Sequence, residues 1–126
     1  MKYAINAEGV PEANGPYSQG TTAGRLVFAS GQLPVSAHDK KTLVEGGIKE
    51  QTERVIDIIE AILAEVDCTL SDVAQTTVYL TDIADLKAVN SVYAKRFTMP
   101  APARNVVAVS ALPMGALIEM DAVACR

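Results

Sequence analysis

The strongest hydrophobic pattern in the chain runs from residue 48 to residue 66 and has helical spacing. Its apolar residues fall on one stripe, while acidic residues take most of the remaining positions. The stripe consists of Ile48, Val55, Ile59, Ile62 and Val66, and it is widened by Ile56, Ile58 and Leu63. A helix of this length spans about 28 Å. The pattern therefore predicts an amphipathic helix that lies across a sheet with its apolar side down.

Two shorter segments have the composition of strands. Residues 26–30 form a β-leaning run that ends at Gly31 and Pro34, and residues 73–80 are rich in β-branched side chains. Residues 36–47 between them are polar and typical of a loop. This loop carries the single histidine, His38, which we expect to be solvated rather than to act as a base.

A second helix is predicted after Asp82, whose side chain can cap the first turn. Apolar residues then recur at steps of three and four, and two prolines stop the pattern. The apolar residues are Leu86, Val89, Tyr93 and Phe97, and the prolines are Pro100 and Pro102. We expect the two aromatic side chains to lie in the core.

The C-terminal part of the chain predicts a β-hairpin. Residues 104–110 and 116–124 have strand character, and the segment 112–115 between them has proline and glycine at positions i+1 and i+3 of a tight turn. With the turn centred on residues 113 and 114, Ala108 would oppose Glu119. Arg104 and Glu119 would then share one face, about 13 Å apart along the ladder.

The order of these elements predicts an α/β fold with both helices packed on one face of a mixed sheet. Residues 106–109 and much of 117–123 are nevertheless apolar on both strand faces, and such strands are normally buried on both. Two helices can cover only one side of the sheet. A copy of the same chain is the simplest cover for the other side, so we expect a symmetric oligomer.

Composition narrows the class of protein. The 126 residues suit one domain, residues 1–126, with 49% hydrophobic and 21% charged residues. No apolar run reaches the roughly 18 residues of a membrane span, and the N-terminus lacks a signal-peptide core. We therefore expect a cytoplasmic protein without membrane contact.

The formal net charge of −4 and six aromatic residues without Trp oppose nucleic-acid binding. Cys68 and Cys125 fit no metal spacing, so no metal is expected.

Arg104 is the most unusual candidate for a binding site. It opens an apolar strand, where a cation is costly to bury unless it is paired. It could pair with a carboxylate of the protein or reach water at the strand end. Alternatively, its planar guanidinium could clamp a ligand carboxylate through two charge-assisted hydrogen bonds, each contributing roughly 1.5–3 kcal/mol.

Glu119 and Asp121 are expected on one strand face, which could be a solvated surface or part of a site. At about 13 Å, Arg104 and Glu119 could serve one small substrate only if the site lies where two subunits meet. Tyr17 and Ser30 lie in turn-prone segments and could contact a ligand or simply pack. No His and Asp partners accompany Ser30, so it is not an activated nucleophile.

Several segments together resemble the RidA (reactive intermediate deaminase, YjgF) family. The resemblance covers about residue 10 to the end, and its most specific part is Pro102-Ala103-Arg104. The other matching segments are residues 15–20 (GPYSQG), 29–34 (ASGQLP), 72–82, 89–93 and 112–120. The resemblance implies a chorismate-mutase-like fold. It also implies a homotrimer in which three sheets close a central barrel and the sites lie between chains.

The same resemblance implies a hydrolase that converts 2-iminobutanoate and 2-iminopropanoate, or their enamine tautomers, to 2-oxo acids and ammonia without a cofactor. Arg104 would grip the substrate carboxylate and Glu119 would activate water. The residues expected to line the cleft are Tyr17, Ser30, Gly31, Asn90 and Val106. Val106 stands where many members have Cys, and Asn105 replaces a common Ser, which puts the substrate preference in doubt.

Two other functions stay open at this point. The chain could be a regulatory module that binds 2-oxo acids without turnover, which would need Arg104 but not Glu119. It could also be an endoribonuclease, an activity reported for some family members. The acidic charge balance and the few aromatic residues make that reading the weakest.

Overall fold

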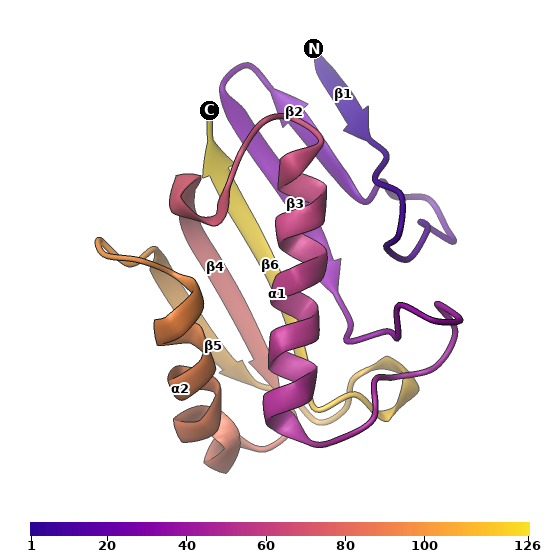
Figure 1. Ribbon diagram of the computed structural model, residues 1–126, viewed down its shortest axis with the longest axis vertical. Coiled ribbons are helices and arrows are strands. Elements are labelled where there is room, and N and C mark those ends of the chain that lie inside the picture. The colour runs from indigo at the N-terminus through magenta and orange to yellow at the C-terminus, as the bar shows by residue number, and fades with distance from the viewer.

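The computed structural model describes residues 1–126 and has one six-stranded mixed sheet with two helices on one of its faces (Figure 1). The spatial order of the strands is β1-β2-β3-β6-β4-β5. The strands are β1 (Lys2–Ile5), β2 (Gly20–Ala23), β3 (Leu26–Gln32), β4 (Val73–Leu80), β5 (Ala103–Ala108) and β6 (Ile118–Cys125). The helices are α1 (Ile48–Ala64) and α2 (Leu86–Arg96). The predicted α/β architecture is confirmed.

The two predicted helices and the strand at 73–80 form where the patterns placed them. The Asp82 side chain accepts a hydrogen bond from the Ala84 N–H at 2.9 Å, which caps a short 3₁₀ turn leading directly into α2. Strands β1 and β2 were not predicted. Their four-residue sequences, KYAI and GTTA, are too short to show a period.

The predicted C-terminal hairpin is wrong. The 3₁₀ turn at Pro113–Gly115 exists, but β5 pairs in parallel with β4, and β6 runs antiparallel between β3 and β4. Four β6 residues are at most 1% exposed, so this strand takes a central position, where both its edges and one face are covered. They are Ile118, Met120, Ala122 and Ala124. The more exposed β5 takes the edge.

The core lies between α1 and the sheet. Val55, Ile59 and Ile62 on α1 are fully buried, as are Val78 on β4 and Ile118 on β6. Burial of each such side chain stabilises the fold by about 1.5–3 kcal/mol. The apolar stripe predicted from the sequence is therefore the stripe that holds α1 on the sheet.

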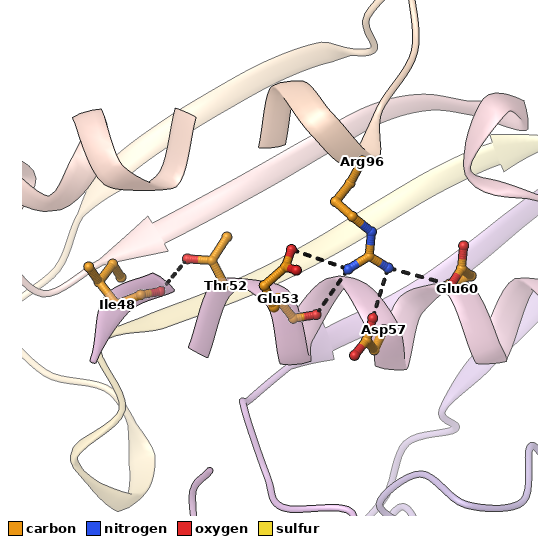
Figure 2. A network of polar contacts seen from close by, with 6 residues as sticks. All are labelled: Ile48, Thr52, Glu53, Asp57, Glu60 and Arg96. Atoms are coloured by element: carbon orange, nitrogen blue, oxygen red, sulfur yellow. Dashed lines mark hydrogen bonds and ion pairs between the residues drawn. The ribbon is translucent and has the colours of Figure 1, made fainter. Parts of the chain in front are cut away.

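Arg96, in the last turn of α2, connects the two helices (Figure 2). Its guanidinium lies 2.8 Å from Asp57, 3.3 Å from Glu53 and 3.4 Å from Glu60, measured between nitrogen and carboxylate oxygen. These three acids follow one side of α1 at steps of three and four residues. One cation thus links α2 to nearly two turns of α1.

The second face of the sheet has no helix against it (Figure 1). Large apolar side chains on this face remain accessible: Leu26 is 45% exposed, Phe28 37% and Val107 41%. The expectation that two helices leave one face open is confirmed. The trimer that would cover this face stays a prediction. Neither helix is long and apolar enough to cross a bilayer.

Candidate functional site

Arg104 lies on the edge strand β5 and points to the face that carries the helices. Its register partner on β4, Thr76, is fully buried on that face. The Nη1 group of Arg104 donates a hydrogen bond to Oδ1 of Asn90 on α2 at 2.8 Å. The guanidinium carbon lies 4.8 Å from the centre of the Tyr93 ring. A guanidinium has five N–H donors, so most of them remain for an anion.

A hollow of about 750 Å³ opens beside this guanidinium. Its walls come from α2 and the segment that leads into β5, and they are largely apolar. The lining residues are Asn90, Tyr93, Ala94, Phe97, Thr98, Met99, Ala101, Pro102 and Arg104. Val106 lies two positions further along β5 on the same face and packs half-buried against the core. An apolar hollow with one cation at its side suits a small organic acid.

Glu119 lies on β6 and points to the open face. Its neighbours in the strand, Ile118 and Met120, are fully buried on the helix face, and alternate residues of a strand point to opposite faces. Burial raises the pKa of the Glu119 carboxyl, and the nearby Asp121 carboxylate raises it further. Asp121 accepts a hydrogen bond from the Tyr79 hydroxyl at 3.2 Å. The raised pKa makes the Glu119 carboxylate a stronger base than an ordinary glutamate.

A β-bulge in β3 lies against Glu119. Ala29 pairs with Ala122 and Gln32 pairs with Met120, so two residues of β3, Ser30 and Gly31, face the single residue Asp121 of β6. A Cβ atom added at Gly31 would overlap the Glu119 carboxylate. Glycine at this position therefore lets the strand backbone pass close to the acid.

Ser30 connects this bulge to the loop that precedes β2. Its hydroxyl donates to the Ser18 carbonyl at 2.6 Å, and its N–H donates to the Gln19 carbonyl at 2.9 Å. The same loop carries Tyr17, which is 56% exposed and lines a hollow of about 320 Å³ together with Gly31. Tyr17, Ser30, Gly31 and Glu119 thus gather in one region.

The prediction that Arg104 and Glu119 share a face is wrong, because it assumed the hairpin register. Arg104 lies opposite Thr76 and Glu119 lies opposite Tyr79, so they are separated by two strand spacings, across β4, and by three register positions. Standard spacings place these strand positions about 14 Å apart. Each chain therefore presents two separate groups of candidate residues, one on each face of the sheet.

The expectation that Tyr93 lies in the core is confirmed, but its spacing did not indicate that the ring lies beneath Arg104. Asn90 and Tyr93 are three residues apart, which puts both on one side of α2. That spacing was visible in the sequence, but the edge strand that lies against it was not.

Both cysteines are free thiols, Cys68 buried and Cys125 exposed. No three His, Cys, Asp or Glu side chains gather as a metal-binding group.

The family described as Endoribonuclease L-PSP matches residues 8–126. A RutC family protein of Pyrococcus abyssi is 46% identical over 125 residues, covering 99% of this chain and 98% of its own. The human 2-iminobutanoate/2-iminopropanoate deaminase is 36% identical over 126 residues, and the match covers 100% of this chain and 91% of the human protein.

The crystal structure of RidA from the Antarctic bacterium Psychrobacter sp. PAMC 21119 superimposes with a TM-score of 0.92. It is 35% identical, and the match covers 98% of this chain and 99% of that one. Since the family description names an endoribonuclease, the expectation that this chain binds no nucleic acid stays a prediction. The match over residues 8–126 and the likeness of the fold show that the chain belongs to the Endoribonuclease L-PSP family, the YjgF/RidA family of reactive intermediate deaminases.

Proposed function

We propose that this protein hydrolyses small 2-imino acids, such as 2-iminobutanoate and 2-iminopropanoate, to 2-oxo acids and ammonia. The observation that carries the proposal is the Arg104 guanidinium, held by Asn90 beside a largely apolar hollow. Such a group fits the carboxylate that every 2-imino acid has, and it can donate two parallel hydrogen bonds to it. The name of the human relative supports the same chemistry.

The active site is formed between two chains of a homotrimer. Within one chain Arg104 and Glu119 lie on opposite faces of the sheet, and no small substrate reaches both. The open face that carries Glu119 also carries Phe28 and Val107, whose exposed apolar side chains favour contact with another copy. A neighbouring chain therefore supplies Glu119, with Tyr17, Ser30 and Gly31, to the cleft that holds Arg104.

The reaction needs one base and good positioning. Arg104 binds the substrate carboxylate. The Glu119 carboxylate accepts a proton from water while the water oxygen bonds to the C=N carbon. The C=N π electrons move to nitrogen, which takes that proton from the Glu119 carboxyl, so the carbon now carries a hydroxyl and an amine. The Glu119 carboxylate then transfers the hydroxyl proton to the amine nitrogen, the C–N bond breaks with its electron pair leaving on ammonia, and the carbon becomes the carbonyl of the 2-oxo acid. The raised pKa of Glu119 makes its carboxylate a stronger base for the first step.

The first test generates 2-iminobutanoate from threonine and traps the surviving imine as a semicarbazone. The protein should lower the trapped yield, and Arg104→Ala and Glu119→Gln should each abolish this effect. The control Glu45→Gln changes an exposed acid far from either group in the sequence and should leave the rate unchanged. If the wild-type protein leaves the yield unchanged, it is not a deaminase; binding of 2-oxobutanoate would then identify a carboxylate-binding module.

The second test asks whether the site is shared between chains. Arg104→Ala and Glu119→Gln proteins are mixed in equal amounts under conditions that allow subunits to exchange. In random trimers, half of the clefts receive an intact Arg104 and half of those an intact Glu119, so about a quarter of wild-type activity should return. Activity that stays absent after verified exchange would show that one chain supplies both residues.

A further inference from the structure

Tyr93 lies beneath the Arg104 guanidinium, and a hydrogen bond holds its own hydroxyl in place. The guanidinium carbon is 4.8 Å from the ring centre, within the distance at which a cation interacts with an aromatic face. The Tyr93 hydroxyl lies 2.8 Å from Oγ1 of Thr76, and this hydrogen bond is buried. Only 6% of Tyr93 is exposed. The ring is therefore a rigid platform rather than a mobile surface group.

Tyr93 and Arg104 lie on two elements, α2 and β5, that are connected by further contacts. Thr76 and Arg104 are register partners on β4 and β5, while Tyr93 and Asn90 lie one turn apart on α2. The Arg104 side chain is thus held between an aromatic face and an amide oxygen. Burial raises the pKa of Tyr93, although Thr76 and Arg104 oppose this shift. The ring stays neutral and attracts the guanidinium through its π electrons.

We propose that Tyr93 is a positioning residue for Arg104, which it holds in place before a carboxylate arrives. A free arginine side chain has many rotamers, and fixing them on binding costs free energy. A ring that holds the guanidinium in advance removes part of that cost. This inference rests on the proposed function only in taking the carboxylate to be that of the substrate.

This role predicts a particular kinetic effect. Because Tyr93 acts through Arg104, which holds the carboxylate alike in the ground and transition states, its loss should raise KM and leave kcat unchanged. A purely structural role is the alternative, since the Tyr93 and Phe97 rings pack with centres 4.4 Å apart. That role would change stability and the amount of folded protein, but not the affinity of the folded protein.

Three variants separate the two roles. Tyr93→Leu removes the ring, and Tyr93→Phe keeps the ring but loses the hydroxyl. Val92→Ala is the control, because Val92 lies on the same helix, is 8% exposed and lines the hollow between α2 and α1 instead. Each variant is examined for thermal stability, for 2-oxobutanoate affinity by calorimetry, and for the Arg104 Nε–H signal by NMR without ligand.

Tyr93→Leu should raise the Kd for 2-oxobutanoate and the KM about tenfold. It should also shift the Arg104 Nε–H signal, because the ring current is lost, and speed its exchange with water, because the restraint is lost. Tyr93→Phe should stay within about threefold of wild type in affinity. Val92→Ala should lower the melting temperature and leave both the affinity and the Arg104 signal unchanged.

An Arg104 signal that is the same in Tyr93→Leu and wild type would overturn the inference, whether or not the protein is a deaminase. An affinity loss in Val92→Ala equal to that in Tyr93→Leu would overturn it as well. If the signal changes as expected but wild-type protein does not consume imine, the proposed function fails while the role of Tyr93 stands.

Discussion

Replacing Gly31 by alanine should displace the Glu119 carboxylate without removing it. A Cβ atom at residue 31 would overlap Oε2 of Glu119 and lie 3.1 Å from its Cδ and 3.5 Å from its Cγ. All three atoms belong to the outer part of a flexible side chain, so the side chain can turn away while the backbone stays in place. Strand β3 also keeps its pairing with β6.

The size of the effect follows from this geometry. A normal contact at the added methyl group requires the carboxylate to move by about 1 Å, and a misplacement of that size can cost about 100-fold in rate. Pushing a side chain about 30° off its rotamer costs about 0.5–1.5 kcal/mol of stability. Gly31→Ala should therefore lower kcat about 100-fold, approaching the loss in Glu119→Gln, while the protein remains folded and still binds 2-oxobutanoate.

The assay measures the disappearance of 2-iminobutanoate, with calorimetry for 2-oxobutanoate and thermal unfolding on the same samples. Gly47→Ala is the matched control, because an added Cβ there has no atom within 4 Å, and it should retain full activity. A folded Gly31→Ala protein with wild-type kcat would refute the reasoning, since the reaction would then not depend on where Glu119 lies.

Three further changes test other parts of the structure. A pH profile of kcat/KM should show the rate falling, as the pH is lowered, already above the ordinary Glu pKa of 4.5. Asp121→Asn should move this loss of rate to lower pH, because it removes a like charge beside Glu119. Because Glu119 is half-buried and its pKa is raised in the folded state, its ionisation should also slightly reduce stability as the pH rises through its pKa. Arg96→Met should lower the free energy of unfolding by about 1 kcal/mol in urea titrations, and by less in high salt, because its three partner carboxylates are half exposed. Phe28→Glu should give a folded monomer by light scattering, and a trimer of unchanged mass would show that the open face does not bind another copy.

The helices and β4 could be predicted because their signals are local. The stripe on α1 and the β-branched run in β4 depend only on neighbouring residues, and Asp82 marks the start of the second helix. The position of β6 depends instead on contacts distant in sequence. The turn at Pro113–Gly115 suggests a hairpin, but burial of Ile118 and Met120 is satisfied only between β3 and β4.

The same limit applies to the candidate site. Arg104 could be singled out because a cation beside an apolar strand is unusual at any register. Its relation to Glu119 could not be predicted, because a change of strand partner decides which face each side chain occupies. Gly31 was expected to line the cleft, but its contact with Glu119 could not be predicted, since the bulge that creates it arises from pairing with β6.

The central place of β6 also has a consequence during synthesis. Because β6 is made after every strand that it joins, β1-β2-β3 and β4-α2-β5 emerge from the ribosome as two incomplete sheets. Until residues 118–125 emerge, β3 and β4 each expose an unpaired edge on which foreign strands can add. A chain that ends within β6 would therefore keep two half-sheets with exposed strand edges, and quality-control proteases should clear it.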